Sequence, residues 1–214
     1  ASPIDKPLIN DCLGRYVTET YNFVADKKIV PSASTEYPES IAALCDMLAD
    51  NFSSEIISEY SLMETPAFNI TIAIEPQFAD NEKEISTYAF FHNYYTGGAH
   101  GTSDLSFTTF KRGRQLKAED IIKPEDMPVV REIIANTIAQ AKGMTTNIYL
   151  TWLNDFLMTD ESTAITAANF PIYSMGIVDE GVVVSYPVYS IGPASDGNPS
   201  YLLPTDIIAP YLAL

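Results

Sequence analysis

Basic residues, histidine and cysteine are all scarce in this 214-residue sequence. Only 12 Lys and Arg stand against 28 Asp and Glu, which gives a net charge of −16. Binding to nucleic-acid phosphates requires a basic face, so this balance argues against a nucleic-acid-binding protein. An acidic surface instead attracts cationic partners and repels anionic membranes. The plainer alternative is that the acidic residues serve solubility alone.

The two cysteines, Cys12 and Cys45, are far apart and lack a Cys-x-x-Cys spacing, which argues against a thiolate metal site. A single structural disulfide in an exported protein and two buried thiols both fit this pattern.

Long hydrophobic runs are also missing. No stretch approaches the roughly 18 apolar residues of a membrane-spanning helix, so we expect a soluble chain. A hydrophobic fraction of 46% with 19% charged residues is typical of a globular protein. The sequence starts at "ASPID", which fits a mature form whose targeting segment has been removed.

Hydrophobic periodicity divides the chain into helical and strand blocks. Helical spacing before residue 64 predicts an N-terminal helical portion over residues 1–64, packed on a main domain over residues 65–214. In the main domain, alternating apolar residues predict a strand over 68–75, a turn over 76–84 and a long returning strand from residue 85. Further hairpins are expected at 111–114 and at 179–181.

Helical patterns separate these hairpins. The helix over residues 123–143 should be capped by Gly143, and a second helix is expected over 147–158. Blocks of helices and antiparallel hairpins predict an α+β fold, with hairpins packed against helices. The expected buried face of the first helix comprises Val130, Ile133, Ile134, Ile138 and Ala141.

One short stretch, "YYTGGAHG" (residues 94–101), combines three of the ten glycines with one of the two histidines. Glycine permits positive φ and close backbone approach, so this stretch should turn sharply after the long strand. Its His100 has two uses open to it: securing the loop through backbone hydrogen bonds, or facing a ligand beside Tyr94 and Tyr95. His92 lies on one strand face with aromatic residues, which favours simple packing.

Enzyme motifs are missing from the sequence. It contains no Gly-x-Ser-x-Gly elbow, His-Glu-x-x-His, phosphate-binding loop or Gly-x-Gly-x-x-Gly. The spacing of His92, His100 and Asp104 is not typical of a metal site. The many acidic residues lie in predicted turns and at predicted helix starts, where a surface role explains them. We therefore expect no metal and no cofactor, and a protein that is more plausibly not an enzyme.

Two stretches together resemble a known family. "YYTGGAHG", followed by a strand, a hairpin and "GRQLKAEDII", resembles the RsiV-like extracellular domain. The C-terminal "DEGVVVSYPVYSIGPASDGNPSYLLPTDIIAPYL" resembles the ending of the same family. The ending's pattern is carried by Gly181, Tyr186, Pro187, Tyr189, Ile191, Pro193, Gly197 and Leu212.

The resemblance implies an exported α+β domain of the bacterial cell envelope, periplasmic or at the cell surface, or a lipoprotein. One member of that family is an anti-sigma factor whose outer domain binds lysozyme, and others are fused to peptidoglycan deacetylases. This sequence shows no membrane segment, no sigma-binding part and no deacetylase metal motif. Neither anti-sigma signalling nor deacetylation is therefore carried over to it.

The leading hypothesis is a non-catalytic binding module for a cell-wall glycan or a cationic protein such as lysozyme. The aromatic rings of the candidate tyrosines would stack on sugars or pack into a protein interface. The alternative is that each ring packs in the core of the protein itself. A rival hypothesis is a wall hydrolase in which His100 is the general base, oriented by Asp104. A third is a scaffold domain without a ligand. The candidate binding residues are Tyr94, Tyr95, Gly97, Gly98, His100, Tyr186 and Tyr189.

Overall fold

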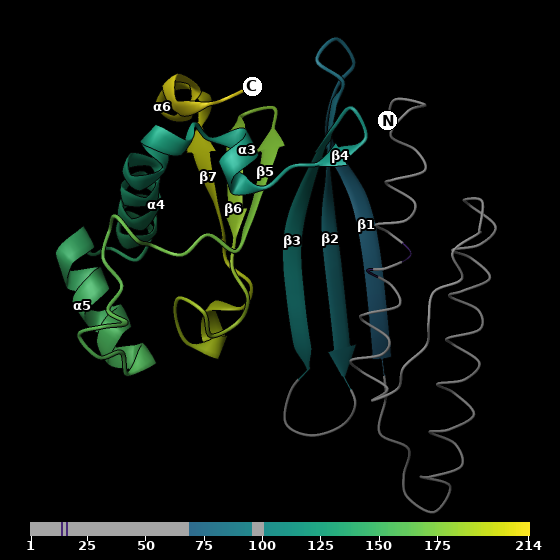
Figure 1. Ribbon diagram of the computed structural model, residues 1–214. Helices are drawn as coiled ribbons and strands as arrows, with labels where there is room; N and C mark the ends of the chain where they lie inside the picture. Colours follow the sequence, from purple (N-terminus) through teal and green to yellow (C-terminus); the bar gives the residue numbers. More distant parts are fainter. Residues whose placement is uncertain (1–13, 15, 17–68, 96–100) are drawn as a thin grey trace, which may run out of the picture.

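The computed structural model describes Gly14, Tyr16, residues 69–95 and residues 101–214. Over these ranges the chain forms two antiparallel sheets, with helices beside the second sheet (Figure 1). This arrangement confirms the predicted α+β fold. The expected N-terminal helical portion and both cysteines lie outside the described residues.

The first sheet has the strand order β1-β2-β3-β4. Its strands are β1 (Asn69–Asp80), β2 (Ile85–Tyr95), β3 (Thr102–Lys111) and β4 (Arg114–Gln115). The side chains of β2 alternate between two faces because successive residues of a strand point in opposite directions. Thr87 and Ala89 face the second sheet, while Tyr88 and Phe90 lie on the face that Tyr16 contacts.

The turn predicted over residues 76–84 is wrong in its first half, because β1 continues through Asp80. A register shift between Pro76 and Phe78 accommodates the proline, which cannot donate a ladder hydrogen bond. The turn itself occupies residues 81–84. It is held by the Asp80 carboxylate, whose Oδ1 accepts hydrogen bonds from the Glu82 and Lys83 amides, each at 3.0 Å.

The second sheet has the order β5-β6-β7. It comprises β5 (Ser174–Val178), β6 (Gly181–Ser185) and β7 (Ser200–Pro204), and every residue of β6 is buried. The hairpin predicted at 179–181 is confirmed. Gly181 adopts φ +146°, and a side chain there would collide with the Leu203 carbonyl, so the position requires glycine.

Two longer helices lie on the side of the second sheet that points away from the first (Figure 1); one packs on β7 and the other packs on that helix. They are α4 (Met127–Ala141) and α5 (Thr146–Leu157), and both were predicted. The shorter elements are α3 (Ala118–Ile121), η1 (Pro124–Asp126), η2 (Ala194–Asp196), α6 (Thr205–Ile208) and η3 (Ala209–Tyr211). No helix in the described part of the chain has the length and apolar character needed to span a bilayer.

The buried face of α4 differs from the predicted face at one end. Val130, Ile134 and Ile138 are fully buried as expected, and Ile133 is partly buried against the same core. Ala141 is exposed, because it lies in the last turn as the chain leaves the core through Lys142 and Gly143, which has φ +70°. The buried alanines are Ala135 and Ala139 instead.

The two sheets meet where β5 crosses the outer edge of β3. The Phe107 amide donates to Ser174 Oγ at 2.6 Å, and the Ile177 amide donates to Thr109 Oγ1 at 3.1 Å. A Cβ added to Gly176 would lie 2.6 Å from the Phe107 Cβ, so the absence of a side chain permits this close approach. Side-chain oxygens thus replace strand pairing and join the sheets into one body.

Candidate functional site

The two stretches that carry the family resemblance meet in three dimensions. β2 ends at Tyr95 and β3 begins at Thr102, and the Ser103 hydroxyl donates a 2.6 Å hydrogen bond to Asn198 Oδ1. Asn198 lies between η2 and β7, in the loop over residues 186–199. We call this contact between the start of β3 and the C-terminal loop the junction. It unites sequence regions almost a hundred residues apart.

The Asn198 side chain is only half satisfied at the junction. Its oxygen accepts from Ser103, but its buried amide nitrogen Nδ2 has no hydrogen-bond partner among the described residues. A buried donor without a partner destabilises a fold by about 1–3 kcal/mol. Within the described part of the chain, the junction therefore contains one buried donor without an acceptor.

A second polar cluster lies on the opposite face of the same hairpin. The Tyr16 hydroxyl and His92 Nδ1 are 2.8 Å apart, and Asp104 is paired across the strands with His92. Tyr16 also packs edge-on against Phe90, with ring centroids 5.0 Å apart. The structure thus supports the packing interpretation of His92 and adds a tyrosine partner that sequence reasoning missed.

Burial controls the protonation of this cluster. Desolvation lowers the pKa of His92 below its usual 6.5, although the Asp104 carboxylate acts in the opposite direction. Desolvation, reinforced by Asp104, raises the pKa of the Tyr16 hydroxyl well above 10. At neutral pH both groups are uncharged, and the tautomer of His92 decides which of the two donates the hydrogen bond. The cluster is suited to holding Tyr16 on the sheet.

The predicted binding tyrosines of the C-terminal loop have different environments. Tyr186 is fully buried among the rings of Phe170, Tyr173 and Tyr201, and its hydroxyl donates to the Pro171 carbonyl at 3.0 Å. For Tyr186 the structure therefore supports core packing, which the sequence left open. Tyr189 is 55% exposed.

Other predicted site residues surround the β2–β3 connection. Tyr94 and Tyr95 are the last residues of β2, and Tyr95 is partly buried. Gly97, Gly98 and His100 lie outside the described residues, so their assignment to a binding site stays a prediction.

An ion pair fixes the C-terminal loop to α4. Lys142 Nζ, at the end of α4, bonds Asp196 Oδ2 and lies 5.7 Å from the ring centroid of Trp152. A Cβ on Gly192 would collide with the same Asp196 carboxylate, so glycine makes room for the pair. Close by, the buried Tyr149 hydroxyl donates to the Ile191 carbonyl at 3.0 Å. These contacts hold the C-terminal loop in place against α4 and α5.

Sequence reasoning missed three of these features: the Tyr16–His92 bond, the Ser103–Asn198 bond and the Lys142–Asp196 pair. Each joins residues at least 50 positions apart, and no local pattern encodes such a pairing. Residues 69–95 and 101–214 contain no group of three His, Cys, Asp or Glu side chains suited to a metal ion.

Comparison with known proteins identifies the fold. No family model and no curated protein matches the sequence. Solved structures do resemble the chain, among them two DUF3298 family proteins. A member of the DUF3298 family from Bacteroides fragilis aligns with a TM-score of 0.62 at 22% identity, covering 84% of this chain and 71% of that one.

The second is a DUF3298 family protein from Pseudomonas aeruginosa PAO1, with a TM-score of 0.52 at 17% identity. It covers 97% of this chain and 80% of the other. The chain therefore has the fold of DUF3298 family proteins.

Proposed function

We propose that this protein is a non-catalytic binding module of the bacterial cell envelope, related to RsiV-like domains, whose partner is a cationic protein such as lysozyme. The observation that carries the proposal is the distribution of charge. From residue 143 to the C-terminus the chain contains no Lys, Arg or His. The same 72 residues hold seven acids, all exposed: Asp155, Asp160, Glu161, Asp179, Glu180, Asp196 and Asp206.

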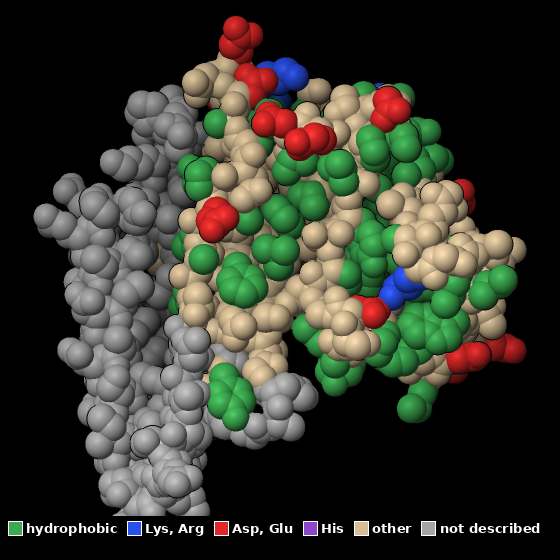
Figure 2. Space-filling model, turned by 180° about the vertical axis from the view of Figure 1, so that it is seen from behind, with side chains coloured by type: hydrophobic (Ala, Val, Ile, Leu, Met, Phe, Trp, Pro, Cys, Tyr) green, Lys and Arg blue, Asp and Glu red, His purple; other side chains and the backbone are tan. Residues whose placement is uncertain are grey.

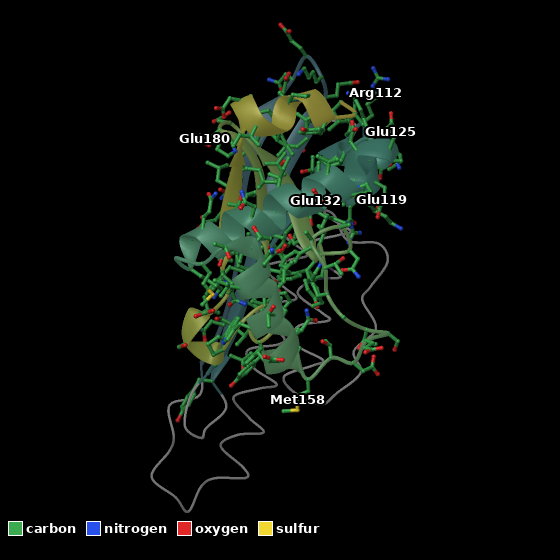
Figure 3. The ribbon with its side chains drawn as sticks, turned by 90° about the vertical axis from the view of Figure 1, so that its left-hand side faces the viewer. Arg112, Glu119, Glu125, Glu132, Met158 and Glu180 are labelled. Atoms are coloured by element: carbon green, nitrogen blue, oxygen red, sulfur yellow. The ribbon has the colours of Figure 1, made fainter. Side chains whose placement is uncertain are left out.

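Few of these acids are neutralised within the protein. Among the described residues, Asp196 alone of the seven forms an ion pair. Figure 2 shows acidic side chains spread over the visible face, where basic side chains are sparse. In Figure 3, Glu119, Glu125 and Glu132 project outward from the α3–α4 side, and Glu180 projects from the β5–β6 turn. The negative potential therefore extends around the C-terminal half.

Several basic residues of the described region are already bonded to the protein. Two donate to backbone carbonyls, and three form ion pairs with carboxylates. They are Lys123, Arg131, Arg112, Arg114 and Lys142. Because acidic residues outnumber basic ones and the net charge is −16, the outward field is dominated by carboxylates, and such a field raises the association rate of a basic protein.

Lysozyme is the natural probe for this proposal, and its binding should be measured by calorimetry or surface-based kinetics. We expect saturable binding that weakens as salt is raised from about 0.05 to 0.3 M, because surface charges are then screened. Cytochrome c, an unrelated basic protein, separates recognition from general charge attraction. Failure of lysozyme to bind at high micromolar concentration would contradict the proposal.

Soluble peptidoglycan fragments form the second arm of the same experiment. Binding of fragments without binding of lysozyme would favour the wall-glycan alternative. The hydrolase hypothesis has its own test. If His100 were a general base, His100→Ala would abolish wall hydrolysis and leave the thermal midpoint unchanged.

Export to the periplasm or cell surface, with or without a lipid anchor, is part of the proposal. It rests on the resemblance to RsiV-like domains. Cell fractionation of the native host, with detection of the full-length product, tests it, and recovery in the cytosolic fraction would contradict it.

A further inference from the structure

Three large apolar residues of α5 recur at intervals of four, which places them in one row along the helix. They are Ile148, Trp152 and Phe156, and we call them the α5 stripe. Trp152 and Phe156 are partly buried against the core, and their rings stack with centroids 5.5 Å apart at an interplanar angle of 13°. Ile148 is 59% exposed. The stripe therefore continues the apolar surface of α5 from the core out to solvent.

The attachment of α5 to the rest of the fold does not require an exposed isoleucine. Tyr149 and Leu153 are fully buried and hold the helix on the core, and the Tyr149 hydroxyl also donates to the Ile191 carbonyl. Burial does not explain Ile148, because more than half of the residue is exposed. Helix propensity does not explain it either, because the stiff β-branched side chain makes isoleucine a weaker helix former than leucine or glutamine.

Acidic side chains border the α5 stripe. Asp155 immediately precedes Phe156 and is exposed, and the exposed Asp160 and Glu161 follow soon after the helix ends. Figure 2 shows hydrophobic side chains gathered on the side of the molecule that carries α5, on the right of the picture, with acidic side chains at their margin. The surface thus combines an apolar centre with a negatively charged border.

Lys142 adds little positive charge to this surface. Its Nζ lies 5.7 Å from the ring centroid of Trp152, but it bonds the Asp196 carboxylate, which neutralises it. Residues 143–214 contain no Lys, Arg or His. The charge beside the α5 stripe is therefore negative.

These two properties define the chemistry of a partner. A second copy of this chain would bring the same acids against one another, and an anionic membrane would be repelled by them. The Trp152 ring already stacks on Phe156 and lies under the Lys142 ammonium, so it is poorly placed to receive a sugar. An amphipathic helix with one apolar and one basic side would cover the stripe and bring Lys or Arg side chains to the acids around it.

We propose that the α5 stripe is a docking site for a basic amphipathic peptide helix, which packs along α5 with its apolar side on Ile148, Trp152 and Phe156. Because α5 has 12 residues and is about 18 Å long, about three turns of the peptide fit along it. Charge attraction speeds the encounter, and burial of the stripe supplies the affinity. The site and its ligand are separate from the cationic protein of the proposed function, so the inference goes beyond that function.

The probe is a synthetic peptide of leucine and lysine in helical periodicity, about 14 residues long. It contains no tryptophan, so Trp152, the only tryptophan of the protein, reports contact with the stripe. We expect saturable binding at micromolar peptide by calorimetry, with a shift of the Trp152 emission to shorter wavelength as water leaves the ring. Binding without a change in emission would place the peptide elsewhere and overturn the proposal. A scrambled peptide of the same composition keeps the charge but lacks an apolar side, and equal binding of both peptides would also overturn it.

Three variants make the test specific. Ile148→Gln should weaken peptide binding about fivefold or more and leave the thermal midpoint nearly unchanged, because the residue is exposed and glutamine is a good helix former. Asp155→Lys should weaken binding at about 0.05 M salt and have less effect at about 0.3 M, where charges are screened. Val129→Gln is the matched control, since Val129 is 41% exposed in the first turn of α4, and it should leave binding unchanged.

The outcomes for this site and for the proposed function are distinguishable. Equal affinity of the wild-type protein and Ile148→Gln for the peptide would overturn the docking site, whatever the result with lysozyme. Peptide binding that depends on Ile148, in a protein that does not bind lysozyme, would support the site and contradict the proposed function.

Discussion

His92 links the first sheet to Tyr16 through one hydrogen bond between side chains. Because desolvation holds the pKa of His92 below its usual 6.5, the unfolded chain takes up a proton at this residue more readily than the folded chain. As the pH falls through and below 6.5, protonation therefore favours unfolding. The contribution of His92 to stability is fully present above pH 6.5 and is lost toward lower pH.

Replacing His92 by glutamine should flatten this dependence. The free energy of unfolding of the wild-type protein should fall more steeply between pH 7 and pH 5 than that of His92→Gln. A glutamine amide can donate to or accept from the Tyr16 hydroxyl, but it does not titrate. Denaturant titrations at several pH values measure both slopes, and parallel curves would contradict the assignment. Acids elsewhere titrate alike in both proteins, so their effect cancels in the difference.

At the scale of secondary-structure elements, the molecule depends on contacts between strands and loops that are distant in sequence. β5 packs on β3 through Gly176, and the C-terminal loop is fixed to α4 through Lys142 and Asp196. In both places a glycine makes room for the neighbouring group, because Gly192 faces the ion pair. Small residues thus determine how closely the elements approach.

Gly176→Ala should destabilise the protein by about 1–3 kcal/mol, the usual range for overpacking a core. The added methyl group would lie 2.6 Å from the Phe107 Cβ and 3.0 Å from the Thr87 Cγ2, so β5 must move away from β3. Chemical denaturation measures the loss. Gly143→Ala is the control, because its new Cβ would enter open space and only the positive φ is penalised. A Gly176→Ala protein as stable as the wild type would show that the sheets do not pack as described.

The Lys142–Asp196 pair can be measured by a double-mutant cycle with Lys142→Met and Asp196→Asn. We expect a coupling energy of up to about 1 kcal/mol, the range for ion pairs that retain contact with solvent. Trp152 is the only tryptophan, and its ring lies under the Lys142 ammonium, so its fluorescence should change when Lys142 is replaced. A coupling energy of zero with unchanged fluorescence would remove the pair as a link between the loop and α4.

For the whole molecule, the dominant property is a net charge of −16. Repulsion among the carboxylates opposes the compact state, and salt screens it over about 10 Å at 0.1 M. The acidic surface that suits a basic partner therefore reduces the stability of the free protein.

Salt should accordingly stabilise the protein at neutral pH. The thermal midpoint at pH 7 should rise between 10 and 150 mM sodium chloride, as calorimetry or circular dichroism would show. Near pH 4.3, the isoelectric point, the same change in salt should have little effect, because the net charge is then close to zero. A midpoint that is independent of salt at pH 7 would mean that self-repulsion is unimportant.

Much of the architecture follows from local sequence patterns. The alternation in β1, the aromatic strand β2 and the apolar face of α4 were predictable, because burial on one face imposes a period on the sequence. The extension of β1 beyond Pro76 was not predictable, since a proline among polar residues is typical of a turn. Pairing with β2 overrides that local preference.

The candidate site was only partly accessible from sequence. Tyr186 and Tyr189 are similar in sequence terms, three positions apart in one loop, yet one ring is buried and the other is 55% exposed. The pairings of Tyr16 with His92 and of Asn198 with Ser103 could not be predicted, because the partners are distant along the chain.

The sequence alone determined the elements, the α+β class and the acidic character, because periodicity, turn residues and charge are local quantities that can be counted. Only the tertiary structure decided that the start of β3 meets the C-terminal loop through Ser103 and Asn198, and that Tyr189 is exposed in a turn with positive φ. Those outcomes depend on how sheets and helices pack, and packing is settled by the shapes of many residues together.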